Sequence, residues 1–148
     1  MNLHDNLQAL GNSAVNKPLY EKQGVDKEVL ERFPNPFKVS NVARCSGSVE
    51  IIAPEFTSLC PLTGQPDFAT IEIEYAPDEW CVESKALKLY LGSFRNQGEF
   101  HESCVNRICN DLVQLLNPLY IRVLGKFTPR GGIAFWPTAE WAQGCESE

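Results

Sequence analysis

The stretch FATIEIEY, from Phe68 to Tyr75, alternates apolar and polar side chains without a break. Ala69, Ile71, Ile73 and Tyr75 fall on one face of an extended chain, and the polar residues between them fall on the other. Such strict alternation is typical of a β-strand with one face on a hydrophobic core. It predicts a strand here, and the elements on either side of this strand decide the fold.

A second strand is predicted just before this one. Residues 46–56 hold apolar and β-branched residues among polar ones, a composition typical of a strand. The sequence TSLCPLTGQPD, from Thr57 to Asp67, then brings proline, glycine and polar residues together and predicts a loop. Two strands joined by a loop that carries Cys60 therefore open the expected domain.

Two amphipathic helices are predicted after the second strand. The first runs from Ser84 to Arg95, with Ser84 as its expected N-cap, and the second follows a break at residues 96–98 and ends at Asn117 and Pro118. Their apolar positions recur at helical spacing: Ala86, Leu87, Tyr90, Leu91 and Phe94 in the first, and Phe100, Cys104, Ile108, Leu112, Leu115 and Leu116 in the second. Each helix therefore presents one apolar face to the core.

Two more strands complete the predicted core. Residues 119–127 alternate, and Ile133–Trp136 returns after a turn at Pro129–Gly132. The order strand, strand, helix, helix, strand, strand predicts an α+β fold, an antiparallel four-stranded sheet with both helices on one face. Four strands leave two open edges, which subunits commonly pair into closed barrels, so we expect a homo-oligomer.

Length and composition favour a single domain in the cytoplasm. The 148 residues suit one core, which we place at residues 41–148, and the polar, turn-rich residues 1–40 predict an N-terminal arm lying over it. A net charge of -6 argues against general nucleic-acid binding. No apolar run is long enough for a secretory signal or a membrane span.

The six cysteines show neither a CxxC pair nor spaced Cys and His pairs, so the sequence predicts no structural zinc site and no disulfide framework. In a reducing compartment, most thiols are expected to be small buried apolar groups. This expectation applies to Cys45, Cys81, Cys109 and Cys145.

Cys60 has a more polar setting than the other cysteines. It lies in the loop between the first two strands, and a carboxylate follows at Asp67. The thiolate is the reactive form of cysteine, and a nearby carboxylate can accept the thiol proton and return it to a substrate nitrogen. On the residues alone, the alternative is a structural cysteine beside a turn-forming aspartate.

The starts of the two helices carry further polar residues. Glu83, Ser84 and Lys85, with Lys88 one turn later, offer backbone N–H and ammonium groups that suit a phosphate. Glu102, at the start of the second helix, can accept two parallel hydrogen bonds from a guanine-like edge. Both groups are also open to a plainer interpretation, since charged residues at helix starts usually form a solvated, locally paired face.

Three segments taken together resemble a known family. LCPLTGQPDFA from Leu59 to Ala69, ESKALKLY from Glu83 to Tyr90 and FHE from Phe100 to Glu102 resemble the 7-cyano-7-deazaguanine reductases, the QueF family, within about residues 40–137. The resemblance implies the single-domain type of that family, with a tunnelling fold and pentameric barrels stacked as decamers. It also implies NADPH-dependent reduction of 7-cyano-7-deazaguanine to 7-aminomethyl-7-deazaguanine, a precursor of queuosine in tRNA.

The resemblance implies a role for each motif residue. Cys60 matches the nucleophile that forms a covalent thioimide with the nitrile carbon, and Asp67 matches the proton donor. The implied substrate-binding residues are Val82, Glu83, Ser84, His101 and Glu102, with Glu102 on the guanine-like face and His101 a further candidate for proton transfer. The implied NADPH-binding residues are Ser84, Lys85, Lys88, Arg130 and Gly131, the last two from a neighbouring subunit.

Alternatives remain open at the level of the sequence. Another tunnelling-fold enzyme acting on a purine or pterin, such as a cyclohydrolase, shares a glutamate that anchors a guanine-like ring, but the sequence holds no suitable cluster of metal ligands. A non-catalytic purine-binding scaffold leaves the pairing of Cys60 with Asp67 unexplained. Cys104, two residues after Glu102, is either a core thiol or the partner of Cys60 in a protective disulfide.

Overall fold

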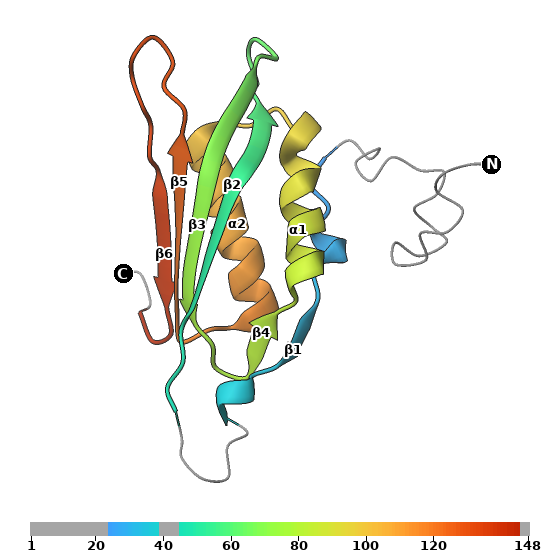
Figure 1. Cartoon of the computed structure of the whole chain (residues 1–148), viewed down its shortest axis with the longest axis vertical. Coiled ribbons are helices and arrows are strands. Elements are labelled where there is room, and N and C mark those ends of the chain that lie inside the picture. Colours follow the sequence, from blue (N-terminus) through green and yellow to red (C-terminus); the bar gives the residue numbers. More distant parts are fainter. Residues whose placement is uncertain (1–23, 39–44, 146–148) are drawn as a thin grey trace, which may run out of the picture.

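The computed structural model describes residues 24–38 and 45–145. Its main sheet contains β2 (Val49–Leu59), β3 (Pro66–Ala76), β5 (Tyr120–Phe127) and β6 (Thr138–Ala142), all antiparallel and in that spatial order. Two helices, α1 (Ser84–Gly92) and α2 (His101–Leu116), lie on the same face of this sheet (Figure 1). The predicted α+β class, with two helices over an antiparallel sheet, is confirmed.

The strand that the alternation predicted lies inside the sheet. β3 pairs with β2 on one side and with β5 on the other. Ala69, Ile71, Ile73 and Tyr75 are all buried, as their spacing predicted. β2 and β5 flank β3, and residues of the two helices pack with its buried side chains. This face of β3 therefore forms the centre of the hydrophobic core.

The helices pack their predicted apolar faces on the sheet, with one exception. The five positions predicted in the first helix are all buried, although the α-helix ends at Gly92 and continues as a 3₁₀ turn over Ser93–Asn96. In α2, Phe100 is exposed and is not part of the core, whereas Val105 and Cys109 are buried. Phe100 precedes the first turn of α2, so the helical spacing does not apply to it.

Two backbone features hold α2 in place. Asn117 ends the helix in the left-handed conformation, with φ 42°, which suits the amide side chain better than most. Gly125 on β5 lies so close to the helix that a Cβ there would meet Cγ2 of Val105 at 2.7 Å. A larger residue at this position would therefore push α2 away from the sheet.

The segment before β2 contributes structure of its own. It contains a 3₁₀ turn at Lys27–Val29, the short strand β1 (Arg32–Pro34) and a second 3₁₀ turn at Pro36–Lys38. β1 pairs with β4 (Trp80–Val82) in a separate two-stranded sheet, which the sequence did not predict. Residues 24–38 thus lie against the domain, while the rest of the predicted arm, residues 1–23 and 39–40, is outside the described residues.

The loop predicted from Thr57 to Asp67 is shorter in the structure. Thr57, Ser58 and Leu59 extend β2 and pair with Phe68, Asp67 and Pro66 of β3, which leaves residues 60–65 as the connecting turn. The predicted boundaries were wrong here because cross-strand hydrogen bonds extend a hairpin through residues of weak strand propensity.

The last strand also differs from the prediction. Ile133–Trp136 forms no strand: Ile133 makes an isolated bridge with Arg130, and the carbonyl of Phe135 accepts from the N–H of Phe127 at 3.3 Å. The strand paired with β5 is β6, further along the chain, and Ile133, Phe135 and Trp136 are exposed in the long connecting loop. The short apolar run at residues 133–136 predicted a buried strand. The register of β5 with β6 instead places the strand further along the chain and leaves these side chains exposed.

The predicted burial of the cysteines holds for only two of the four. Cys81 and Cys109 are buried, whereas Cys45 and Cys145 are exposed near the ends of the described segments.

Within residues 24–38 and 45–145, no helix is both long and apolar enough to cross a membrane.

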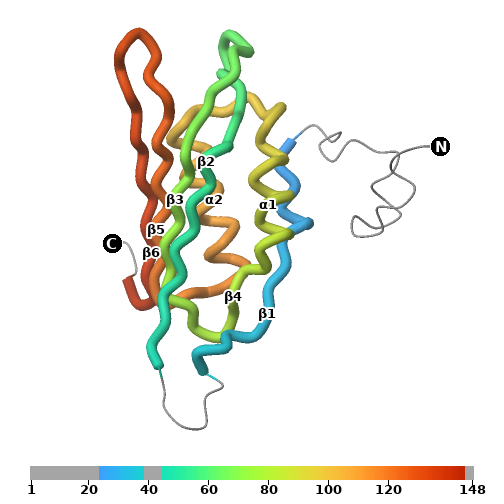
Figure 2. Tube along the Cα trace, in the orientation of Figure 1, coloured from blue at the N-terminus to red at the C-terminus, as the bar shows by residue number. Residues whose placement is uncertain are grey.

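Three connections meet at one end of the sheet. Figure 2 shows the β2–β3 turn, the long β5–β6 loop and the link between α1 and α2 at the same end of the molecule. β4 and the first turn of α1 lie at the opposite end. This division separates the sequence motifs into two groups.

Candidate active site

The nucleophile candidate lies in a tight turn at the first of these ends. The N–H of Cys60 donates to the carbonyl of Gln65 at 2.8 Å, and the N–H of Gly64 donates to the carbonyl of Cys60 at 2.9 Å. Gly64 has a φ of 70°, a conformation that glycine adopts at little cost. The turn therefore holds Cys60, which is half-buried, directly beside the ends of β2 and β3.

Hydrogen-bond donors surround the sulfur of Cys60. The side-chain hydroxyl of Thr63, the backbone N–H groups of Thr63 and Leu62, and the guanidinium of Arg130 together lower the pKa of Cys60 from 9.0 to about 6. Donors favour the charged form of the thiol over the neutral one. At neutral pH the group is therefore mostly thiolate, the reactive form.

Asp67 is buried beside this turn. Its residue opposite on β2 is Ser58, and one carboxylate oxygen, Oδ1, accepts a hydrogen bond from Nη2 of Arg130. The other oxygen, Oδ2, lies 3.2 Å from Nε2 of His101. The structure thus brings Cys60, Asp67, His101 and Arg130 together within one chain.

Packing fixes the orientation of His101. Its ring stacks on the ring of Phe127 at the end of β5, with centroids 3.8 Å apart and planes inclined by 9°. His101 is the first residue of α2, and the stacking holds its imidazole so that it faces Asp67. The neighbouring Glu102 also lies in the first turn of α2 and is exposed, so its carboxylate is open to a ligand.

The backbone ties the Cys60 turn to the start of α2. The N–H of Leu59 donates to the carbonyl of Gln97 at 2.9 Å, and the N–H of Glu99 donates to the carbonyl of Leu59 at 3.1 Å. Glu99 is further held by an ion pair with Arg107 at 3.0 Å. These bonds fix the position of the segment before Cys60 relative to the segment before His101.

Sequence reasoning missed Thr63 and Glu99 as parts of this region. Thr63 appeared only as one polar residue of a loop, and Glu99 as a residue before a helix. Burial raises the pKa of Glu99, which marks it as an internal carboxyl group. A carboxylate just before the FHE segment was the signal that could have drawn attention to it.

Cys104 lies in the core, as one of the two predictions for it proposed. It is fully buried, and burial raises its pKa to about 12. Both Cys60 and Cys104 are free thiols in the structure. The disulfide between them stays an untested prediction.

The second group of motif residues begins α1. The N–H of Val82 donates to the hydroxyl of Tyr75 at 3.1 Å, which links β4 to the far end of β3. The N-cap of α1 is Glu83, not Ser84 as predicted: its carboxylate accepts from the N–H groups of Lys85 at 3.0 Å and Ala86 at 2.7 Å. These bonds lower the pKa of Glu83.

Capping by Glu83 corrects the predicted phosphate site. The backbone N–H groups of Lys85 and Ala86 are already bonded and are not free for an anion. Ser84, Lys85 and Lys88 are exposed, and both ammonium groups remain available, whereas the hydroxyl of Ser84 donates to the carboxylate of Glu83 at 3.3 Å. Two ammonium groups and a hydroxyl fit a phosphate-bearing cofactor such as NADPH, without the helix N-terminus.

The two groups are far apart in one chain. Val82 contacts Tyr75, whereas the Cys60 turn contacts Asp67, and these two positions lie near opposite ends of β3. Eight residue steps of a strand at about 3.3 Å each separate them by about 26 Å. A single chain therefore does not bring Glu83 and Ser84 to Cys60.

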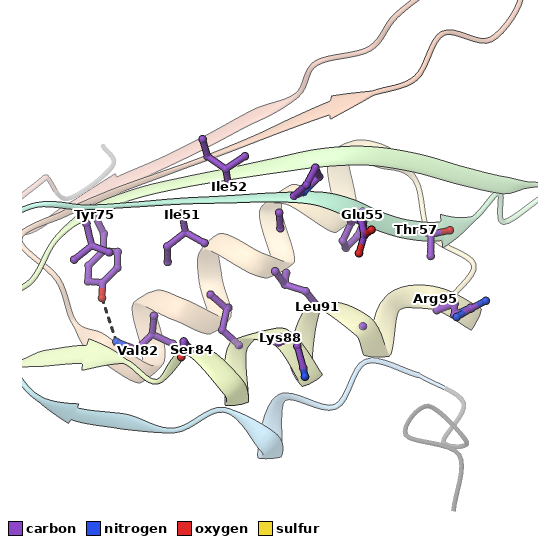
Figure 3. Close-up of a pocket in the computed structure, with 16 residues that line it drawn as sticks. Ile51, Ile52, Glu55, Thr57, Tyr75, Val82, Ser84, Lys88, Leu91 and Arg95 are labelled. Carbon is purple, nitrogen blue, oxygen red and sulfur yellow. Dashed lines mark hydrogen bonds between the residues drawn. The ribbon is translucent and has the colours of Figure 1, made fainter. Parts of the chain in front are cut away.

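A groove of about 640 Å³ runs between β2 and α1 (Figure 3). Ser84 and Lys88 line it from the helix, and Arg95 lies at its far end. The wall formed by β2 is mostly apolar, with Ile51 and Ile52 among the lining residues. Cys60, Asp67 and His101 do not line this groove, so it is separate from the nucleophile in the single chain.

Gly131 lies in the turn that carries Arg130. Its φ is 55°, and a Cβ added there would meet no atom within 4 Å. The turn is thus open to solvent at this point.

Within the described parts of the chain, no group of three or more His, Cys, Asp or Glu side chains is arranged to hold a metal ion.

Proteins of known name are similar to this chain over most of its length. The chain is 57% identical over 134 residues to the NADPH-dependent 7-cyano-7-deazaguanine reductase of Bacillus velezensis, covering 90% of this chain and 76% of the relative. It is 51% identical over 143 residues to the reductase of the same name from Neisseria meningitidis serogroup B, covering 96% and 85% respectively.

A solved structure and a family profile extend the comparison. The structure titled archaeosine synthase QueF-Like, in the apo form, superposes with a TM-score of 0.62 at 22% identity, covering 69% of this chain and 99% of that one. This similarity shows a shared fold. The profile described as QueF-like protein matches residues 66–145, more than half of the sequence, and the chain therefore belongs to the QueF family.

Proposed function

We propose that this protein reduces the nitrile of 7-cyano-7-deazaguanine to the amine of 7-aminomethyl-7-deazaguanine with NADPH. The observation that carries the proposal is a cysteine with a strongly lowered pKa next to a buried aspartate that contacts both a histidine and an arginine. Relatives at over 50% identity bear the name of this reductase, which supports the same reaction.

Cys60 begins the reaction. Its thiolate adds to the nitrile carbon and forms a C–S bond, which converts the triple bond into the C=N bond of a thioimide. The nitrile nitrogen gains a proton in this step, and Asp67 is the group placed to deliver it. His101, bonded to the other oxygen of Asp67, is placed to resupply that proton.

Two hydride transfers complete the reduction. NADPH supplies the hydrides when bound, one molecule for each transfer. After the first transfer, the C–S bond breaks and Cys60 returns to the thiolate form, which its hydrogen-bond donors favour. The imine that remains accepts the second hydride at carbon and a second proton at nitrogen, which Asp67 is placed to deliver, and becomes the amine.

Glu102 recognises the base in this proposal. An exposed carboxylate in the first turn of a helix can accept from the ring N–H and the exocyclic amine of a guanine-like edge. His101, Val82, Glu83 and Ser84 complete the proposed substrate site. Since Glu83 follows Val82, which contacts the Tyr75 end of β3 about 26 Å from Asp67, it belongs to the site of a neighbouring copy.

The same separation supports a homo-oligomer. β2 and β6 are the edges of the main sheet, and each exposes unpaired backbone groups to a second copy. Pairing these edges closes the sheets into a barrel and brings the start of one α1 towards the Cys60 turn of the next chain. We propose a tunnelling-fold barrel, assembled as a decamer of two pentamers.

The proposed cofactor contacts come from opposite ends of the folded domain. Ser84, Lys85 and Lys88 offer a hydroxyl and two cations at α1, and Arg130 and Gly131 lie in the β5–β6 loop.

We assign the reaction to the cytoplasm, where NADPH is available and thiols stay reduced. We place the catalytic domain at residues 41–148, with residues 1–40 as an arm.

Cofactor consumption tests the proposed function. Protein is mixed with NADPH and 7-cyano-7-deazaguanine while the absorbance of the reduced cofactor is followed. Two equivalents of NADPH consumed for each base, with the amine as product, support the reductase. No consumption contradicts it, and hydrolysis of a purine or pterin ring, or binding of the base without turnover, would identify the alternative functions.

A further inference from the structure

Arg130 has a defined place that its expected role does not explain. It lies in the turn after β5, where its N–H donates to the carbonyl of Ile133 and the N–H of Ile133 donates back, each at 3.0 Å. Gly131 and Gly132 follow with φ values of 55° and 78°, a conformation that lets the chain reverse at once. The turn is thereby fixed relative to β3.

From this turn the Arg130 side chain reaches back over its own chain. Nη2 donates to Oδ1 of Asp67, a carboxylate that is only 6% exposed. The same guanidinium lowers the pKa of the Cys60 thiol, so it also acts on the sulfur. One cation thus pairs with Asp67 and stabilises the thiolate of Cys60.

The charges around Cys60 explain why such a cation is needed. A thiolate in a half-buried turn, beside the oxygens of a carboxyl group, is unfavourable without a positive group nearby. His101 contacts Asp67 through Oδ2, on the other side of the carboxylate. Thr63 and the backbone of Leu62 donate hydrogen bonds to the sulfur but carry no charge.

We propose that Arg130 is a positioning residue that activates the nucleophile of its own chain, by bridging Cys60 and Asp67 before any cofactor binds. This extends the proposed function, from which it takes only the assignment of Cys60 as nucleophile. The planar fork of a guanidinium can serve two acceptors at once. Since the side chain is 38% exposed, it keeps a free edge for a cofactor phosphate, and both roles are compatible.

Alkylation of Cys60 tests the proposal without substrate or cofactor. Iodoacetamide reacts with the thiolate, so the rate between pH 5 and 9 reports the fraction of thiolate. The rate is read from the peptide that contains Cys60 by mass spectrometry, because Cys45 and Cys145 are also exposed. In Arg130→Gln, we expect the midpoint to rise by on the order of one pH unit, about tenfold slower alkylation below the midpoint.

Two further variants make the result specific. Arg130→Lys keeps the charge without the fork and is expected to shift the midpoint by a smaller amount. Arg122→Gln is the matched control: Arg122 is also on the β5 side of the sheet, but it pairs with Glu140 at 3.1 Å and lies opposite Glu74, away from Cys60. Its midpoint is expected to equal that of the unchanged protein.

The proposal is overturned if Arg130→Gln and Arg122→Gln give the same midpoint as the unchanged protein. Circular dichroism establishes that each variant is folded, and Arg130→Lys supplies the measurement if Arg130→Gln is not. Covalent addition of the nitrile base to Cys60 is measured separately. Absence of that adduct, with a raised midpoint in Arg130→Gln, contradicts the proposed function and leaves the role of Arg130 intact.

Discussion

The two ends of the central strand carry different kinds of site. At the Asp67 end, the proposed acid contacts a histidine and an arginine of the same chain, and that arginine also lowers the pKa of the proposed nucleophile. At the Tyr75 end, Val82 and Glu83 bond to β3, to the chain near β1 and to the first turn of α1, and the lysines beside them are exposed. The difference supports our proposal that one chain supplies the chemistry, while recognition of the ligands is completed between chains.

The largest effect is expected from Cys60→Ala. If the Asp67 end carries the chemistry, removing the sulfur abolishes both the covalent adduct and turnover, since no other group can form the C–S bond. Mass spectrometry of protein incubated with the nitrile base measures the adduct, and cofactor absorbance measures turnover. Binding of the base is expected to persist in this variant, and turnover at the unchanged rate would show that the chemistry lies elsewhere.

A smaller loss is expected from Asp67→Asn. The amide keeps the shape of the side chain but cannot deliver a proton, so kcat should fall by about 10²–10⁴-fold, the usual range for general acid–base groups. Asp78→Asn is the control at the opposite end, because Asp78 pairs with Lys38 on the surface. Equal values of kcat in the two variants would contradict the division between the ends.

The pH dependence of adduct formation should follow Cys60. Because its pKa is lowered to about 6, thiolate is present above that pH and is lost below it. One pH unit below the midpoint, formation of the adduct should be about tenfold slower than on the plateau above it. Stopped-flow measurement between pH 4.5 and 9 gives the profile, and a midpoint near the ordinary thiol value of 9.0 would show that the donors around the sulfur have no effect.

The smallest effect, and the sharpest test of the comparison, is recovery in mixed oligomers. Cys60→Ala and Glu83→Gln chains are co-expressed, each having lost activity alone. If a site takes Cys60 from one chain and Glu83 from its neighbour, random assembly should restore about one quarter of the sites.

The control is co-expression of Cys60→Ala with Asp67→Asn. These two residues share one end of one chain, so no mixed site contains both intact, and no recovery is expected. Recovery in the second mixture, or its absence in the first, would show that the residues are divided between chains in another way.

Much of the fold followed from local patterns. β3 and both helices were predicted because alternation and helical spacing reflect burial on one face, and most of their predicted apolar residues are buried, with Phe100 the exposed exception. The end of β2 and the position of β6 could not be predicted in this way. Both depend on hydrogen bonds to a strand distant in sequence, which override the propensity of Thr57–Leu59 and of Ile133–Trp136.

The sequence by itself determined the class of the fold and singled out the loop that we propose as reactive, because periodicity and residue chemistry are local properties of a chain. Only the tertiary structure decided that Arg130 contacts Asp67, 63 positions earlier, and that Glu83 rather than Ser84 caps α1. It also decided that the motifs lie at opposite ends of β3. The physical reason is that contacts across a sheet depend on strand register and loop length, which no local pattern contains.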